Sequence, residues 1–65
     1  MKNRIKEFRA RDSLTQTDLA NKVRVSRQTI SLIERNKFVP SIVTAYKISK
    51  TFDETIENTF IMEDE

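Results

Sequence analysis

Residues 15–37, TQTDLANKVRVSRQTISLIERNK, constrain the fold more than any other part of this chain. Thr15 and Ser26 are hydroxyl residues of the kind that begin helices, and each precedes apolar residues spaced three or four positions apart. Asp18, three positions after Thr15, can complete a capping box. The pattern predicts two short amphipathic helices joined by a tight turn, and the second helix has a polar outer face.

Three further helices are predicted around this pair. Apolar residues among lysines and arginines predict a first helix over 2–11, Ser41 can begin a fourth helix, and Thr55 a short fifth. Residues 38–40 form a connection, because proline disfavours helix at the residue before it. The predicted inward-facing residues are Ile5, Phe8, Leu14, Leu19, Ala20, Val23, Val25, Ile30, Ile33, Ile42, Ala45, Ile48, Ser49, Phe52, Ile56 and Phe60, with Tyr46 at the core edge. The chain therefore reads as one all-α domain over residues 1–65.

Composition limits what can stabilise such a domain. The 65 residues contain neither cysteine nor histidine, so the sequence offers no disulfide and no common zinc site. A chain of this length buries only ~60% of the surface that its unfolded form exposes. Stability must therefore come from helix packing, with dimerisation as a further source.

The missing residue types also argue against an enzyme. Without histidine or cysteine, catalysis would rest on Asp, Glu, Lys, Ser or Tyr, and no pair of these stands out. We therefore expect no catalytic residue, no metal, no cofactor and no small-molecule effector site. No apolar run approaches the ~20 residues that cross a bilayer, and no secretory signal is present. We expect a soluble cytoplasmic protein without membrane contact.

The net charge of +2 conceals a strong asymmetry between the two halves. Residues 1–37 hold ten Lys and Arg against four acids, a net +6, whereas residues 38–65 hold two against six, a net −4. A basic half suits a polyanion, because phosphate contacts release counterions and dominate affinity. Charged residues are also simply what small soluble proteins carry on their surface, so charge alone leaves both interpretations open.

The outer face of the helix predicted over 27–35 carries the most specific chemistry. At 100° per residue, this face holds Gln28, Ser31, Leu32 and Arg35, opposite Ile30 and Ile33. Gln28 can bond an adenine edge in two places, and Arg27, on the flank, can do the same to guanine. Leu32 can pack against a thymine methyl group. The alternative is a solvated face with one exposed leucine.

The spacing of this segment resembles the helix-turn-helix of the Cro/C1 repressor family, often called the Xre family. Residues 16–26 follow the pattern Gln-x-x-x-Ala-x-x-x-Gly-Val-Ser, with Arg24 where glycine is usual. The resemblance continues through SRQTISLIE at 26–34, ERNKFVPSI at 34–42 and AYKISKTF at 45–52. It implies a compact five-helix, lambda-repressor-like DNA-binding domain with the motif at 16–35.

The resemblance also implies a set of DNA contacts, because the second motif helix enters the major groove in this family. The expected base contacts are Arg27, Gln28, Ser31 and Leu32. The expected contacts to the DNA backbone are Gln16, Ser26, Thr29, Arg35, Asn36 and Lys37. Gln16 stands at a helix N-terminus, which suits an anion. The alternative for Gln16 is a simple helix-start residue, and for Lys37 a solvated charge.

Other positions of the family pattern predict structure. Arg9 and Glu34 match a salt bridge between the first helix and the end of the reading helix. Arg24 and Asn36 replace glycines. If the turn keeps its usual left-handed shape, arginine should be strained by ~1–2 kcal/mol, so either the turn differs or the domain carries this cost. Thr59 replaces an apolar residue, so the fifth helix should be short or frayed.

The leading hypothesis is a homodimeric, sequence-specific regulator of transcription that binds double-stranded DNA, acting as a repressor on a pseudo-palindromic operator. Two copies reading half-sites about one helical turn (~34 Å) apart multiply specificity. Residues 56–62, with the apolar run at 60–62, are the candidate dimer contact; the alternatives for that run are a satellite of the core and a disordered end. A second hypothesis is a protein-interaction module, antitoxin-like or an adaptor, that keeps the fold and binds a protein partner. RNA binding fits less well, because helices do not enter the A-form major groove.

Overall fold

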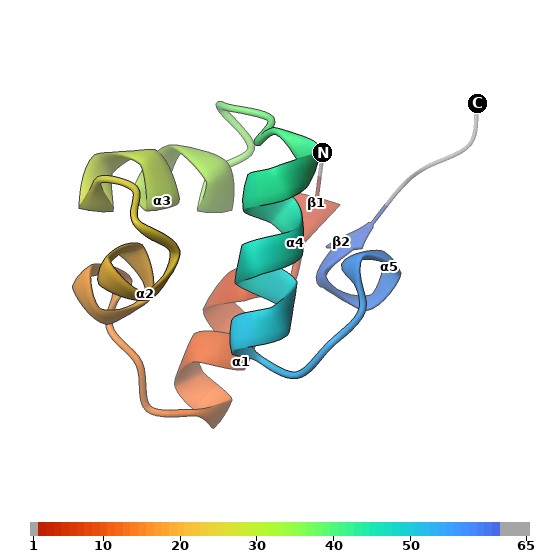
Figure 1. Cartoon of the computed structure of the whole chain (residues 1–65), viewed down its shortest axis with the longest axis horizontal. Coiled ribbons are helices and arrows are strands. Elements are labelled where there is room, and N and C mark those ends of the chain that lie inside the picture. Colours follow the sequence, from red (N-terminus) through yellow and green to blue (C-terminus); the bar gives the residue numbers. More distant parts are fainter. Residues whose placement is uncertain (1, 62–65) are drawn as a thin grey trace.

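Five short helices and one pair of two-residue strands form the domain (Figure 1). The computed structural model describes residues 2–61. The elements in order are β1 (Lys2–Asn3), α1 (Ile5–Arg11), α2 (Gln16–Val23), α3 (Arg27–Glu34), α4 (Ile42–Thr51), α5 (Ile56–Thr59) and β2 (Phe60–Ile61). The predicted five-helix fold is confirmed, with the strand pair as an addition. No helix among the described residues is long and apolar enough to cross a membrane.

Hydroxyl side chains begin four of the helices, as predicted. Thr15, Ser26, Ser41 and Thr55 each accept a hydrogen bond from the backbone N–H three residues later. At the start of α2 the capping box is complete, because the Asp18 carboxylate accepts from the Thr15 N–H at 3.0 Å. The Thr15 backbone N–H lowers the pKa of Asp18, since it stabilises the ionised carboxylate. In a chain without glycine, these caps define where the helices start.

The core gathers around α4, which lies between the α2–α3 pair and the α5–β2 segment (Figure 1). Its fully or nearly fully buried apolar members are Ile5, Phe8, Leu19, Ala20, Val23, Ile30, Ile33, Ala45, Ile48, Phe52 and Phe60. Leu14, Val25 and Ile56 pack against this cluster from its edge. The prediction for Ile42 was wrong: its side chain is 69% exposed. Ile42 is the first residue of α4, at the end of the core rather than over it.

The N-terminal segment pairs with the C-terminal one, so the first helix is shorter than predicted. Lys2 and Asn3 pair antiparallel with Ile61 and Phe60, respectively, and α1 begins only at Ile5. The Asn3 side chain accepts from the Ile5 N–H at 3.1 Å. This pairing also places Phe60 in a strand, where it is 1% exposed. Phe60 therefore belongs to the core of its own chain, as the alternative interpretation of the run 60–62 predicted, and not to a dimer contact. Met62, the last residue of that run, lies outside the described residues.

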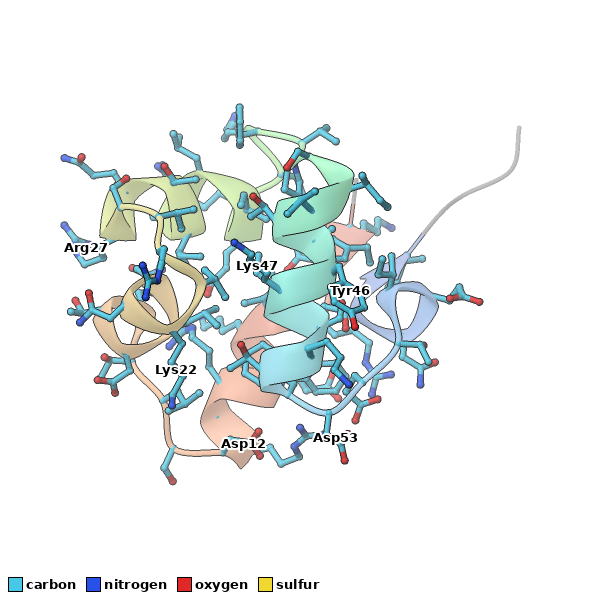
Figure 2. All side chains as sticks on the ribbon, viewed as in Figure 1. Asp12, Lys22, Arg27, Tyr46, Lys47 and Asp53 are labelled. Carbon is cyan, nitrogen blue, oxygen red and sulfur yellow. The ribbon has the colours of Figure 1, made fainter. Side chains whose placement is uncertain are left out.

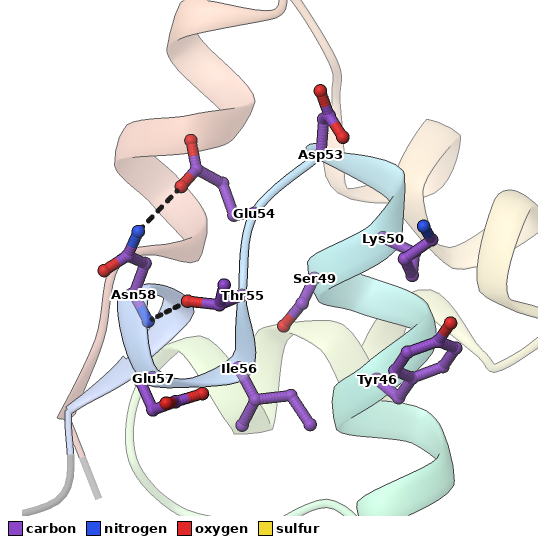
Figure 3. A pocket seen from close by; sticks show the side chains of 9 residues that line it. All are labelled: Tyr46, Ser49, Lys50, Asp53, Glu54, Thr55, Ile56, Glu57 and Asn58. Atoms are coloured by element: carbon purple, nitrogen blue, oxygen red, sulfur yellow. Dashed lines mark hydrogen bonds between the residues drawn. The ribbon is translucent and has the colours of Figure 1, made fainter.

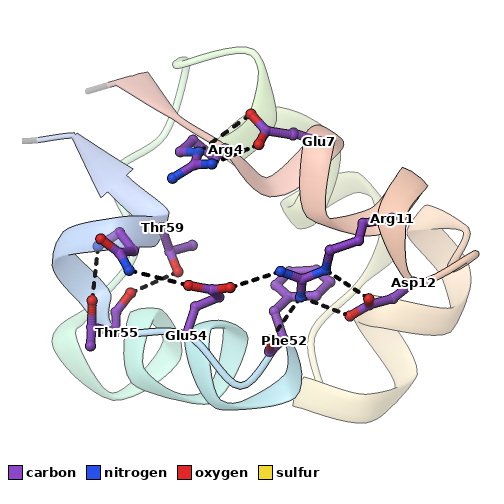
Figure 4. A network of polar contacts seen from close by, with 9 residues as sticks. Arg4, Glu7, Arg11, Asp12, Phe52, Glu54, Thr55 and Thr59 are labelled. Carbon is purple, nitrogen blue, oxygen red and sulfur yellow. Dashed lines mark hydrogen bonds and ion pairs between the residues drawn. The ribbon is translucent and has the colours of Figure 1, made fainter.

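A polar network fastens α1 to the segment that joins α4 to α5 (Figure 4). The Arg11 guanidinium bonds Asp12 at 2.8 Å, Glu54 at 2.7 Å and the Phe52 carbonyl oxygen at 2.8 Å. It also lies over the Phe8 ring, 4.7 Å from the ring centroid. Hydrogen bonds from Arg11 lower the pKa of Asp12 and of Glu54. The stabilisation is present above the unfolded pKa values and is lost as pH falls through the folded ones.

Among residues 2–61, four have left-handed backbone angles: Ser13, Arg24, Asn36 and Asp53. Arg24 has φ 63° and ψ 45°, and closes α2 with its N–H bonded to the Ala20 carbonyl oxygen. The turn of the helix-turn-helix thus keeps the left-handed shape for which glycine is usual, and the Cβ of Arg24 is strained in it. The left-handed angle at Asn36 costs less, because asparagine tolerates this region.

Replacing Arg24 by glycine is expected to raise the free energy of unfolding by about 0.5–1 kcal/mol. Glycine removes the Cβ strain but loses more backbone freedom on folding, so only part of the strain is recovered. Urea unfolding followed by circular dichroism measures the change. Asn36→Gly is the matched control and should gain less. A loss of stability in Arg24→Gly would show that contacts of the arginine side chain outweigh the strain.

Candidate nucleic-acid interface

One face of α3 packs on the core and the other is open to solvent. Ile30 and Ile33 are buried, whereas Arg27, Gln28, Leu32 and Arg35 are exposed. Ser31 and Thr29 are half-buried at the edges of the outer face. Figure 2 shows Arg27 at the outer end of α3, directed away from the body of the domain. The outer face inferred from helical periodicity is therefore the face that the fold leaves open.

Two of the four predicted base-contact residues have unengaged polar groups. Within residues 2–61, neither Arg27 nor Gln28 makes a side-chain hydrogen bond to another residue. Leu32 is 38% exposed on the same helix. The donors of Arg27 and the donors and acceptor of Gln28 are thus available to an external ligand without breaking an internal bond. The apolar Leu32 side chain lies on the same face.

The predicted backbone-contact residues differ in how far the fold already uses their side chains. The Ser26 and Thr29 hydroxyls bond each other at 2.8 Å, and Ser26 also caps α3. The Gln16 amide donates to Glu34 at 3.2 Å, and the Asn36 amide oxygen accepts from Asn3 at 3.3 Å. Arg35 makes only a long bond, 3.4 Å, to the carbonyl oxygen of Ser31. Lys37 is exposed and makes no ion pair with another described residue.

A buried ion pair fixes α3 against the rest of the domain. The Arg9 guanidinium makes two hydrogen bonds to Glu34, at 2.6 and 3.1 Å, and a third to the Leu14 carbonyl oxygen at 3.1 Å. The two side chains are only 15% and 8% exposed. With Gln16 also bonded to Glu34, the pair joins α1, the start of α2 and the end of α3. The predicted salt bridge is confirmed, and it holds the outer face of α3 in one orientation.

A second anchor of α3 was not predicted from the sequence. The Asn3 amide donates to the Ile33 carbonyl oxygen at 2.9 Å, and this bond reaches across 30 positions of the chain. Asn3 is held in place by the β1–β2 pair, so the far end of the chain helps to position the helix. Nothing in the local pattern marks Asn3 for this role, because the partner is a backbone group distant in sequence.

The described acids of the second half lie away from the outer face of α3. An open depression between α4 and α5 has the residues labelled in Figure 3 along its walls, and Asp53, Glu54 and Glu57 are among them, together with Lys50. At this wall, the Glu54 carboxylate accepts from the Asn58 amide at 3.2 Å. Near α3 the exposed charges are mainly cationic, on Arg24, Arg27, Arg35 and Lys37. Within residues 2–61, cations therefore gather near α3; the acids at 63–65 lie outside the described residues.

Comparisons of the sequence and of the structure with known proteins all find helix-turn-helix regulators. The family model described as helix-turn-helix matches residues 5–57, most of the chain. A relative in Methanocaldococcus jannaschii, an uncharacterized HTH-type transcriptional regulator, is 54% identical over 65 residues, which cover 100% of this chain and 98% of the relative.

Two solved structures have the same fold. SinR, a master regulator for biofilm formation solved in complex with DNA, superposes with a TM-score of 0.76 at 34% identity, covering 83% of this chain and 87% of that chain. A chain of the SinR–SinI protein complex gives a TM-score of 0.77 at 34% identity over 83% of this chain; this chain spans about half of it, 53%. The chain therefore belongs to the Cro/C1-type helix-turn-helix family of transcriptional regulators.

Proposed function

We propose that this protein is a repressor that binds a pseudo-palindromic operator in double-stranded DNA as a homodimer, and that it works in the cytoplasm as a single domain. Arg27, Gln28, Ser31 and Leu32 contact base edges; Gln16, Ser26, Thr29, Arg35, Asn36 and Lys37 contact the DNA backbone. One observation carries the proposal: the exposed face of α3 presents unengaged Arg27 and Gln28 side chains on a helix anchored by the buried Arg9–Glu34 pair. The structural likeness to SinR, solved with DNA, supports it.

The two groups of contacts play different physical parts. Hydrogen bonds from Arg27 and Gln28 to base edges distinguish sequences, because each base pair presents its own pattern in the major groove. Contacts from Lys37 and Asn36 to phosphates position the domain on any duplex. The Ser26 hydroxyl accepts from the Thr29 N–H and also bonds the Thr29 hydroxyl. The hydroxyl that accepts in that second bond keeps its own proton, so we expect it to donate to a phosphate at the start of α3.

Selection of binding sites from a random pool of duplexes tests the proposal directly. The expected product is a two-fold symmetric consensus with half-sites about one helical turn apart (~34 Å). A pool that shows no enrichment at low salt would refute DNA binding. Enrichment of one asymmetric site would refute the homodimer but leave base readout in place.

Gln28→Ala is expected to weaken binding to the selected operator by about 1–3 kcal/mol and to relax specificity at one position of each half-site. Lys37→Ala should instead weaken binding to all duplexes alike and reduce the salt slope by about one. Fluorescence anisotropy titrations at several salt concentrations, on operator and scrambled duplexes, separate the two effects. Equal loss on both duplexes for Gln28→Ala would contradict its assignment as a base reader.

A protein partner is the second candidate function, because one structural neighbour was solved as the SinR–SinI protein complex. A module that acts only through a partner needs no duplex affinity. Binding to DNA that weakens steeply with salt therefore distinguishes the two functions.

A further inference from the structure

We propose that the homodimer forms through an apolar surface at the start of α4, and not through the C-terminal residues 56–62. This surface, here called the α4 apolar surface, consists of Phe38, Val39, Ile42, Val43 and Tyr46. The inference rests on the proposed homodimer and states which part of the chain a second copy contacts.

The members of the α4 apolar surface are the most exposed large apolar side chains among the described residues. Their exposed fractions run from 50% to 69%. On α4, Ile42, Val43 and Tyr46 lie within an arc of about 100°, and the buried residues of the helix lie on another arc. Phe38 and Val39 extend the surface into the connection before the helix. A continuous apolar patch of this kind marks an interaction site, unlike scattered single residues.

The chemistry of the patch points to a second copy of the same chain. Residues 38–46, FVPSIVTAY, contain no charge, although 34% of the chain is charged. In a two-fold dimer the same patch meets itself, so any charge at its centre would face a like charge. An uncharged apolar patch avoids that repulsion and buries no unpaired ion.

The area fits a dimer that assembles from folded monomers. Five side chains at this exposure present on the order of 500 Å² of apolar surface, the size of the largest patch on a typical monomer. Two copies would bury on the order of 1,000 Å² in total, near the lower limit for a specific complex. The core is closed within one chain, and its buried side-chain polar atoms all have partners in the described part. The free dimer is therefore expected to be weak and to be completed on the operator.

The position of the surface is also suitable for binding two half-sites. It begins directly after Lys37, at the C-terminal end of α3, and continues along α4 to Tyr46. Figure 2 shows Arg27 at the end of α3 that is farther from α4, whereas Tyr46 lies on α4, on the side toward α5. Two copies that meet at this surface keep both α3 outer faces free, with the Arg27 ends turned away from the two-fold axis. A contact at Phe60 would instead require an already buried side chain, since it is 1% exposed.

Ile42→Glu tests the inference, with Ile61→Glu as the matched control on the C-terminal segment. Both isoleucines are exposed, and an acid at the first position of α4 favours the helix, so the fold should survive. Ile42→Glu is expected to raise the dimer dissociation constant at least about tenfold in sedimentation equilibrium. It should also abolish cooperative binding to a duplex with two half-sites while leaving affinity for a single half-site unchanged. Ile61→Glu should behave as the wild type in both measurements.

The outcomes separate this inference from the proposed function. If Ile42→Glu dimerises and binds cooperatively like the wild type, or if only Ile61→Glu loses dimerisation, the α4 apolar surface is not the interface, although the DNA-binding homodimer stands. If the wild type is monomeric both free and on two half-sites, the surface serves another partner and the inference is overturned together with the homodimer. Normal dimerisation that depends on Ile42, with no salt-dependent affinity for any duplex, would support the interface and refute the proposed function.

Discussion

Glu34→Ala is expected to lower the free energy of unfolding by roughly 3–5 kcal/mol, because it leaves the Arg9 guanidinium buried without its carboxylate partner. The same change also removes the acceptor of the Gln16 amide. A domain of this length has a total stability of roughly 3–10 kcal/mol, so much of the variant should be unfolded at 25 °C. Chemical denaturation followed by circular dichroism measures the change.

Glu7→Ala is the matched control for this effect. Glu7, on α1, forms an ion pair at 2.7 Å with Arg4, the residue before the helix, but the Arg4 and Glu7 side chains are 41% and 61% exposed (Figure 4). An exposed pair contributes little, since water already solvates both charges. The denaturation midpoint of Glu7→Ala should stay close to that of the wild type. Equal losses in both variants would show that burial does not decide the strength of the Arg9–Glu34 pair.

Phe60→Ala is expected to cost about 3–5 kcal/mol, the usual loss for a large aromatic side chain removed from a core. Its neighbour Ile61 is 40% exposed on the other face of the same strand, so Ile61→Ala should cost much less. Thermal unfolding of the two variants, measured at the same protein concentration, gives the comparison.

This pair of variants also separates a core role from a dimer role for the C-terminal segment. If Phe60 served as a dimer contact, Phe60→Ala would weaken association and leave a folded monomer. The buried position predicts loss of the monomer fold itself. A stable, folded Phe60→Ala monomer would contradict the packing described above.

Local signals in the sequence were sufficient where neighbouring residues decide the structure. Hydroxyl residues at Thr15, Ser26 and Ser41 start helices in the structure as predicted, because the cap hydrogen bond spans only three residues. The buried face of α3 followed from helical periodicity alone. The family pattern left two possibilities at Arg24, a different turn or a strained one, and only the structure shows the left-handed angle.

Local signals failed where distant parts of the chain meet. Residues 2 and 3 were included in the first helix because they directly precede its apolar positions and carry no helix-breaking residue, but pairing with residues 60 and 61 makes them a strand. Ile42 fits the periodicity of α4 and is nevertheless exposed, since no described element covers the first turn at that position. The hydrogen bond from the Asn3 amide to the Ile33 carbonyl oxygen could not be predicted either, because its partners are 30 positions apart in the sequence.

By itself, then, the sequence determined the number and order of the helices, the solvent-exposed face of α3 and the Cro/C1-type family. Caps, periodicity and spacing act within a few residues, so they can be read without knowing the fold. Tertiary structure alone decided which apolar residues remain exposed and added the second anchor of α3, the bond from Asn3. Burial depends on which elements pack together, and the burial of Phe60 is why we propose the start of α4 as the dimer contact in place of residues 56–62. In this small domain, the apolar side chains that stay exposed indicate where a partner can bind, and the buried ones indicate how the domain folds.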